Sequence, residues 1–314
     1  MKCFLKSMLA FSVFFVVIYS LLIFLWGNFA PQRLKPNLNY RIGSYGHMFS
    51  RLKELKTIDE VDLLFLGSSH AYRGFDPRVF KKELSKDIEV FNLGSSAQTP
   101  IETELLLSRY LDKLNPKTVI YEVYPGTFSS DGVESSLDVI SNDINDLSSV
   151  RMAMNINHIK TWNTLIFGSF WDFFGLNSVF IEPKQKGNDK YVPGGYVEKK
   201  LTHYKYMKYS KKQWEFKKSQ FDGFERCLSV IQNKNIRLIF VYAPITSALY
   251  RSYVNNDIFD TKMQMYGEYY NFNEIIELDD SFHFYDSHHL NQRGVNIFNK
   301  KLIDVVFLKN EMIE

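Results

Sequence analysis

Two short stretches, far apart in this 314-residue chain, hold side chains that could carry out nucleophilic chemistry. Ser69 follows Gly67-Ser68, which come directly after an apolar run at 63–66. Asp286 and His289 stand three residues apart near the other end of the chain. A serine hydroxyl becomes nucleophilic when a histidine accepts its proton and a carboxylate fixes the tautomer of that histidine. The residue types therefore predict Ser69 as nucleophile, His289 as general base and Asp286 as the residue that orients it.

Such a serine also needs hydrogen-bond donors for the oxyanion that forms when it attacks. The backbone N–H of Ser69 is one candidate, and the N–H of Gly94, after a second apolar run, is another. We expect Asn92 to brace that loop. Tyr124, at the end of a third apolar run, is a candidate side-chain donor.

Several neighbouring polar residues have weaker claims on the same site. Ser68 is an alternative nucleophile, ranked below Ser69. His70, Arg73 and His288 are candidate substrate contacts, and Arg73 would suit an anionic or hydroxyl-rich substrate. The simpler alternatives are a surface position for Arg73 and a solvent-facing or cap-facing position for His288.

The histidines near the C-terminal end also allow a different chemistry. His283, Asp286, His288 and His289 are of the residue types that bind zinc. No cluster of cysteine or glutamate accompanies them, and a metal site would leave the serine stretch without a role. The sequence therefore favours the serine site, with no metal and no other cofactor.

Three motifs together resemble a known family. Gly67-Ser68-Ser69, Asn92-Leu93-Gly94 and Asp286-x-x-His289 resemble blocks I, II and V of the SGNH (GDSL-like) hydrolase superfamily, most closely its membrane-anchored branch. The similarity covers residues 60–125 and 236–310. It implies a serine esterase or O-acyltransferase that handles ester-linked acyl groups of a cell-envelope glycan through an acyl-serine intermediate.

One block departs from the family pattern. Block III normally supplies an asparagine, whereas here the third apolar run ends Glu122-Val123-Tyr124-Pro125-Gly126. Loss of one oxyanion donor typically lowers the rate by about 10²–10³-fold. The alternative is therefore a non-catalytic member of the family that binds a glycan or assembles with an envelope complex. The resemblance implies an acylated glycan or other ester substrate, and a membrane acyltransferase as a further candidate partner.

Short apolar runs alternate with helical patterns along the chain, which is typical of parallel βαβ units. We expect a three-layer, doubly wound (flavodoxin-like) α/β fold with a mostly parallel five-stranded sheet. The expected strands lie at 63–66, 88–93, 118–124, 237–242 and 282–285. Helices are expected at 48–56, from Asp76-Pro77, from the capping box Thr99-Pro100-Ile101-Glu102 and from about Asn291.

Residues 126–210 interrupt this alternation. They contain a Ser/Asp-rich run, an aromatic cluster and Gly194-Gly195. A connection of this length is far longer than an ordinary crossover. We expect it to form a cap over the carboxyl edge of the sheet, where open α/β folds bind their ligands.

The N-terminal part carries a long apolar segment. Residues 7–26 contain no charge and are long enough to cross the hydrocarbon core of a membrane. A cleaved signal peptide, the alternative, normally has a shorter apolar core, and Asn28-Phe29-Ala30 is a poor cleavage site. We expect a single transmembrane anchor at 1–27, a tether and lead-in helix at 28–60, and the α/β domain at 61–314. The family resemblance favours a cell-membrane protein with this domain outside the cytoplasm.

The charge balance excludes one class of partner. Lys and Arg number 38 against 35 Asp and Glu, for a formal net charge of +3, and no clustered basic motif is present. These features predict no nucleic-acid partner. Cys3 and Cys227, on opposite sides of the apolar segment, cannot form a disulfide framework.

Overall fold

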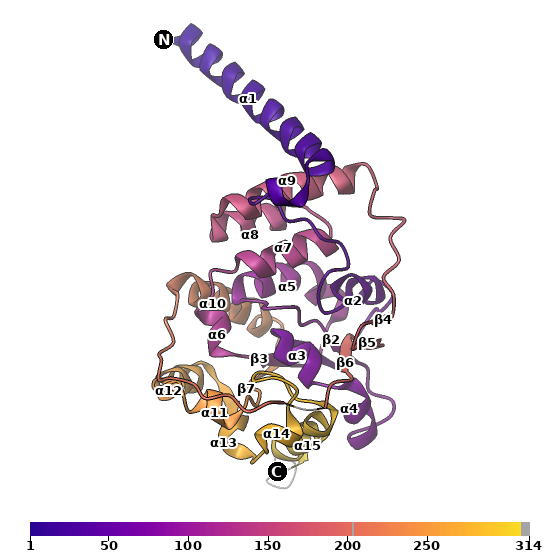
Figure 1. Cartoon of the computed structure of the whole chain (residues 1–314). Coiled ribbons are helices and arrows are strands. Elements are labelled where there is room, and N and C mark those ends of the chain that lie inside the picture. The colour runs from indigo at the N-terminus through magenta and orange to yellow at the C-terminus, as the bar shows by residue number, and fades with distance from the viewer. Residues whose placement is uncertain (203, 309–314) are drawn as a thin grey trace.

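A sheet of five parallel strands forms the centre of the molecule, in the order β2-β1-β3-β7-β8. The computed structural model describes residues 1–202 and 204–308 (Figure 1), so the expected end of the domain, residues 309–314, lies outside them. The strands are β1 (Leu63–Leu66), β2 (Val90–Asn92), β3 (Thr118–Glu122), β7 (Arg237–Tyr242) and β8 (Glu268–Asn271). The prediction of an α/β fold with a five-stranded parallel sheet is confirmed.

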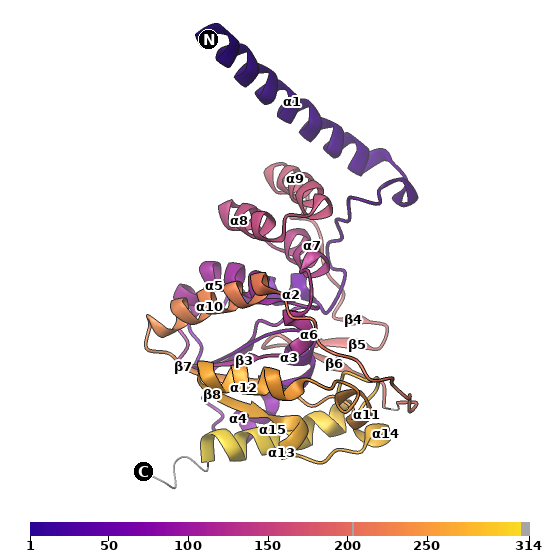
Figure 2. The same ribbon diagram turned by 90° about the vertical axis from the view of Figure 1, so that its left-hand side faces the viewer.

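Side chains of β1 alternate between two hydrophobic cores, one on each face of the sheet. Leu64 and Leu66 belong to one core, and Leu63 and Phe65 belong to the other. The first core includes side chains of α2 (Met48–Leu55), α5 (Pro100–Leu114) and α10 (Lys218–Gln232), and the second includes those of α4 (Pro77–Glu83) and α15 (Gln292–Ile303). Figure 2 shows these two groups of helices above and below the strands. Burial on both faces explains why the strands are continuous apolar runs.

Three helices begin at the capping residues that the sequence indicates. The Asp76 carboxylate caps α4, and Thr99 and Glu102 form a reciprocal capping box at the start of α5. The side chain of Asn291 accepts two backbone N–H groups at the start of α15. These starts, and the lead-in helix α2, are confirmed.

The predicted fifth strand at 282–285 is wrong. Residues Asp280–His283 form the helical turn α14, and Phe284 makes only an isolated bridge with Leu290. The true fifth strand, β8, has the polar sequence EYYN and lies at the edge of the sheet, where its side chains are mostly half-exposed. An edge strand needs no continuous apolar run, which is why the pattern did not identify it. The other helices around it are α11 (Ser247–Tyr250), α12 (Asn256–Tyr266), α13 (Phe272–Ile275) and the π-helical turn Asp304–Leu308.

The long insertion divides into a helical part and a small sheet. Its helices are α6 (Pro125–Phe128), α7 (Val133–Asn142), α8 (Leu147–Ile156) and α9 (Ile159–Phe173), and its antiparallel strands are β4 (Gln185–Lys186), β5 (Asp189–Val192) and β6 (Tyr196–Lys199). Helices α7 and α8 pack on α5, and α9 packs on α7 and α8. The small sheet instead contacts α3 (Ser69–Gly74) through β6.

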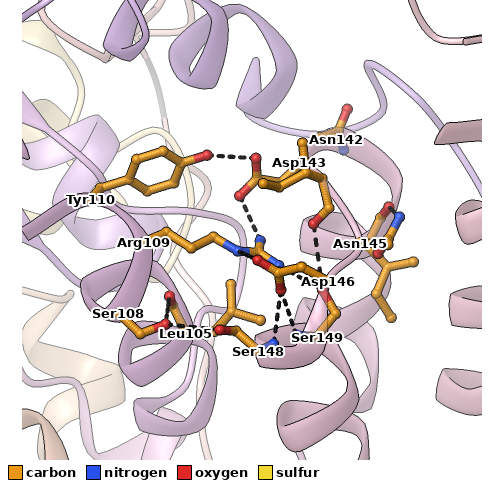
Figure 3. A network of polar contacts seen from close by, with 12 residues as sticks. Leu105, Ser108, Arg109, Tyr110, Asn142, Asp143, Asn145, Asp146, Ser148 and Ser149 are labelled. Carbon is orange, nitrogen blue, oxygen red and sulfur yellow. Dashed lines mark hydrogen bonds and ion pairs between the residues drawn. The ribbon is translucent and has the colours of Figure 1, made fainter. Parts of the chain in front are cut away.

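Of the insertion that was expected over the carboxyl edge, only the small sheet lies there, beside α3. The helices α7–α9 stack on the outer side of α5, away from the five-stranded sheet (Figure 2). Three consecutive leucines, 105–107, are all buried, so α5 presents apolar side chains in several directions and needs partners besides the sheet. Arg109 of α5 also binds Asp143 and Asp146 between α7 and α8, as Figure 3 shows.

The N-terminal helix α1 (Lys2–Phe29) is long and apolar enough to span a membrane. The segment that follows it begins with a 3₁₀ turn, Gln32–Leu34, and is not a free tether. Its backbone donates hydrogen bonds from Asn39 to Thr164 Oγ1 (3.1 Å) and from Arg41 to Ser141 Oγ (3.0 Å). The connection is therefore fixed along α7 and α9.

Candidate active site

Ser69 lies at the carboxyl edge of the sheet, as the first residue of α3. The strand before it ends at Leu66, and Gly67 turns the chain with φ of +131°. A Cβ at Gly67 would lie 2.7 Å from the Cβ of Glu122, so the turn requires glycine. Because it opens a helix, Ser69 has a backbone N–H with no intrahelical acceptor.

The structure brings the three predicted residues of the nucleophilic site together. The Nε2 atom of His289 lies 2.8 Å from Ser69 Oγ, although the two residues are 220 positions apart. The Nδ1 atom of His289 lies 2.9 Å from Asp286 Oδ2. With the Nδ1 proton donated to Asp286, Nε2 is an acceptor for the serine hydroxyl.

The loop that carries Asp286 and His289 is closed by its own hydrogen bonds. Asp286 Oδ1 accepts the backbone N–H groups of His288 and His289, each at 2.8 Å. Burial opposes ionisation of Asp286, but these N–H groups and the His289 ring outweigh it and lower the pKa of Asp286 to about 2. The carboxylate is thus ionised wherever a histidine can act as a base.

The ring of His289 is also held by other rings. It is nearly parallel to the ring of Tyr285, with centroids 5.5 Å apart, and to the ring of His70, with centroids 5.1 Å apart. These contacts restrict rotation of the imidazole and keep Nε2 directed at Ser69.

A second polar cluster lies beneath the first, and it was not predicted. Glu122, the last residue of β3, is buried, and its Oε2 accepts hydrogen bonds from both the N–H and the Oγ of Ser68, each at 2.8 Å. Burial raises the pKa of Glu122 to about 7. Ser68 Oγ also lies 3.0 Å from His70 Nδ1. The only feature of the sequence that pointed to this cluster was Glu122, a single acidic residue in an otherwise apolar run.

This cluster distinguishes the two adjacent serines. Ser68 is buried and its hydroxyl is hydrogen-bonded to Glu122, whereas Ser69 is partly exposed and faces His289. The geometry therefore supports Ser69 over Ser68 as the nucleophile.

Asn92 braces the loop after β2, and one of the groups that it holds is the N–H of Gly94. Asn92 Nδ2 donates to the carbonyl oxygen of Ala71 (2.8 Å), and its Oδ1 accepts the N–H of Gly94 (3.1 Å). The N–H that was predicted to bind an oxyanion is thus used within its own loop. A Cβ at Gly94 would lie 2.9 Å from the Cβ of Ala71, so this glycine allows the loop to approach α3 closely.

Tyr124, His70 and His288 lie next to the candidate triad without lining the cavity in front of it. Tyr124 Oη is 3.3 Å from His288 Nδ1, and the ring of Tyr124 is 4.4 Å from that of His70. Burial and the neighbouring His289 lower the pKa of His288 to about 4, and burial lowers the pKa of His70 well below its usual value. The predicted roles of His70 and His288 as substrate contacts gain no support, because neither residue lines the cavity.

Ser69 opens into a cavity of about 400 Å³. Its walls come from the segment before α2, α3, the loop after β2, the small sheet of the insertion and the loop before α15. The lining residues are Ser44, Tyr45, Gly46, Ser69, Tyr72, Arg73, Ser96, Lys186, Asp189, Lys199, Tyr285, Asp286 and His289. The insertion was expected at this edge, but no local motif marks its lining residues or those of the N-terminal segment.

Arg73 lines this cavity but is not free to bind an anion. Its guanidinium forms a two-point ion pair with Asp189 of β5, at 3.0 and 2.9 Å, and Lys199 Nζ lies 2.8 Å from the same carboxylate. Burial opposes ionisation of Asp189, and the two cations outweigh it and lower its pKa to about 2. Arg73 therefore joins α3 to the insertion within the cavity wall.

The four candidate zinc ligands do not converge. His283 Nδ1 accepts the N–H of Asp279 (2.9 Å), while His289 pairs with Asp286. Within residues 1–202 and 204–308, no group of three or more His, Cys, Asp or Glu side chains is arranged to hold a metal ion.

No protein-family model and no curated protein matches the chain. Its chemistry must therefore be inferred from the site. A serine hydroxyl, an oriented imidazole and an ionised carboxylate, at the mouth of a cavity, are the groups that nucleophilic acyl transfer requires.

Proposed function

We propose that this protein is a membrane-anchored serine esterase or O-acyltransferase of the SGNH type, built on a three-layer, flavodoxin-like domain. The observation that carries the proposal is the alignment of Ser69 Oγ, His289 and Asp286, with contacts of 2.8 and 2.9 Å, at an open cavity. The strand order, with the serine after the first strand and the histidine before the last helix, is compatible with it.

In the first half of the reaction, His289 Nε2 takes the proton from Ser69 Oγ while Oγ attacks the carbonyl carbon of an ester. The tetrahedral intermediate collapses, the bond from carbon to the alcohol oxygen breaks, and His289 returns the proton to the departing alcohol. An acyl-serine remains. Water or a sugar hydroxyl then loses a proton to His289 and attacks the acyl carbon. The bond from this carbon to Ser69 Oγ breaks, and His289 returns the proton to Oγ. Water gives an esterase, and a sugar hydroxyl gives an O-acyltransferase.

The oxyanion would be held by the N–H of Ser69 and by a donor from the loop after β2. Ser96 lines the same cavity as Ser69, whereas the N–H of Gly94 is bonded to Asn92. We assign the second donor to Ser96 for this reason. It would substitute for the block III asparagine that the chain lacks.

The cavity walls favour a hydroxyl-rich substrate. They carry three tyrosines, among them Tyr72 and Tyr285, together with Ser44 and Ser96. Aromatic rings and hydroxyl groups suit the mixed apolar and polar faces of a sugar. Together with the resemblance to membrane-anchored SGNH proteins, this supports an acylated envelope glycan as substrate, with the domain outside the cytoplasm and a membrane acyltransferase as a candidate partner.

The test is covalent labelling of the full-length protein with a serine-directed phosphonate, alongside hydrolysis of a simple acetyl ester. Ser69→Ala should abolish labelling and lower turnover by about 10⁴-fold or more. Ser229→Ala, at an exposed position on α10, is the control and should match the unaltered protein. Undiminished labelling of Ser69→Ala would remove the proposal.

A second function, non-catalytic glycan binding, has one observation in its favour. The N–H of Gly94 and the hydroxyl of Tyr124, two of the predicted oxyanion donors, are engaged with Asn92 and His288. Saturable glycan binding by a protein that no phosphonate labels at Ser69 would favour this alternative.

A further inference from the structure

Helix α9 of the insertion packs directly against the C-terminal part of α1. The ring of Phe24 lies 4.9 Å from that of Phe170 and 5.7 Å from that of Phe174. The hydroxyl of Tyr19 donates to Asn163 Oδ1 at 2.6 Å. Both views show α9 beside this part of α1, with the five-stranded sheet farther away (Figures 1 and 2).

These contacts set the depth of α9 if α1 crosses a bilayer. The uncharged residues 7–26 span about 30 Å at the helical rise, which matches the hydrocarbon thickness of a membrane. Tyr19 precedes the end of this span by seven residues, or about 10 Å. A helix that contacts α1 from Tyr19 onward therefore reaches the outer part of the hydrocarbon layer and cannot lie wholly in water.

The outer surface of α9 has the composition that such a position requires. An apolar groove of about 470 Å³ runs between the helices and is lined by Ser20 of α1, Val150 of α8 and, from α9, by Trp162, Leu165, Ile166, Ser169, Phe170 and Phe173. The following residues, 173–181, contain no charge. Phe173, Val179 and Ile181 are among the most exposed large apolar side chains of the domain. An exposed apolar groove of this kind marks an interaction site.

The charged residues of α9 do not break this surface. Lys160 pairs with Glu134 of α7, and Asp172 accepts the N–H of Asn145 at 2.8 Å. Both are thereby directed toward the rest of the insertion. The turn after α1 is also closed, because Lys35 Nζ donates to the carbonyl oxygen of Gly27 at 2.8 Å.

We propose that α9 and residues 173–179 are embedded in one leaflet of the bilayer, beside the end of α1 from which the domain emerges. The embedded segment ends before Phe180, whose ring packs on Phe49 of α2. The occupant of the apolar groove is then lipid acyl chain. Two helices then hold the domain on the membrane: α1, which crosses the bilayer, and α9, which lies in its plane. The orientation of the domain over the membrane is therefore fixed. This inference requires that α1 spans the membrane, but it does not depend on the chemistry of Ser69.

The experiment uses the full chain, one copy per lipid nanodisc, with a polarity-sensitive fluorophore on one introduced cysteine in a background with Cys3→Ser and Cys227→Ala, which replaces both native thiols. The probe is placed in turn at Phe173→Cys, at Val16→Cys in the middle of α1, and at Met265→Cys on α12. Phe173 and Met265 are both 82% exposed, so they are matched in accessibility and differ in location. Lipids carrying a nitroxide on the acyl chain serve as quencher.

Probes at positions 16 and 173 should emit at shorter wavelength and be quenched at least about threefold more than the probe at 265. Quenching at 16 with behaviour at 173 equal to that at 265 would overturn the proposal and leave the anchor intact. Shielding at 173 without quenching by lipid would also overturn it, in favour of a covering protein segment. Val179→Cys, 84% exposed, repeats the measurement if Phe173→Cys does not fold.

Discussion

Glu122 ends the central strand of the sheet and holds the residue before the candidate nucleophile. Its Oε2 accepts both hydrogen bonds from Ser68, and the absence of a side chain at Gly67 lets the turn lie against it. The position of Ser69 is therefore set from behind by a carboxylate as well as from the front by His289. A buried carboxylate is a costly way to hold a loop unless it is hydrogen-bonded or protonated.

Replacing this carboxylate with an amide should change how stability depends on pH. The folded protein holds the Glu122 proton more tightly than the unfolded chain, because burial raises its pKa from 4.5 to about 7. Its contribution to the free energy of unfolding is therefore complete below pH 4.5 and is lost as pH rises through 7, by a total on the order of 3 kcal/mol. Glu122→Gln keeps an oxygen for Ser68 but has no proton to lose. Its stability relative to the unaltered protein should thus increase from pH 4.5 to 7.

Urea unfolding of the full chain in detergent micelles, at pH 4.5, 6 and 8, measures this difference. Glu60→Gln, at an exposed position, is the control and should run parallel to the unaltered protein at all three values. A Glu122→Gln curve that also runs parallel would mean that Glu122 ionises normally in the folded state.

At the scale of the elements, α5 is the link between the sheet and the insertion. One side of the helix packs in the sheet core, and Arg109 reaches from it into the turn between α7 and α8 (Figure 3). There the guanidinium contacts Asp143 and Asp146, each at 2.7 Å, and Asp146 also caps α8. The ion pairs and the cap together fix the positions of α7 and α8 relative to the sheet. They thereby fix those of α9 and of α1, which packs on α9.

Removal of the Arg109 guanidinium should therefore cost more than removal of a surface cation. The Arg109 side chain is 5% exposed and that of Asp143 is fully buried, so Arg109→Met leaves a buried carboxylate without its cation. Loss of one partner from such a pair typically costs about 3–5 kcal/mol. The matched control is Lys234→Met. It breaks an exposed pair with Asp112, which is on α5 like Arg109, and should cost less than about 1 kcal/mol. Equal losses in chemical denaturation would show that the Arg109 network is no stronger than a surface pair.

Across the whole molecule, the sequence predicts best what local chemistry determines. Asp76 and Thr99 mark helix starts through their own hydrogen bonds, and Ser69, Asp286 and His289 stand out because their types and order are specific. These parts of the fold and of the candidate site could be predicted.

The remaining parts depend on contacts between segments that are distant in the chain. The edge strand β8 is polar, so neither its length nor its pattern separates it from a loop. Asp189 and Lys199 reach the cavity only because the insertion folds back onto α3. The engagement of the Gly94 N–H by Asn92 is a matter of loop geometry. No spacing in the sequence carries this information.

Under the proposed function, a change in the cavity wall formed by the insertion should lower the turnover of large substrates. The reactivity of Ser69 should stay almost unchanged. Asp189 belongs to β5 and holds Arg73 and Lys199 in the wall, whereas Ser69 is positioned by Glu122, Ser68 and His289. Asp189→Asn removes the charge that orders both cations. Turnover of an O-acetylated oligosaccharide should then fall by about tenfold or more, a change equivalent to about 1.4 kcal/mol.

The rate at which a small phosphonate labels Ser69 should stay within about threefold in the same variant, because the acylating groups are not altered. Asp222→Asn, which breaks an exposed pair with Lys218, controls for a general effect of losing a surface charge. Equal losses in both assays would mean that the insertion positions the nucleophile itself. The small sheet would then help to position and activate Ser69, and the insertion would act in the reaction itself as well as in substrate binding.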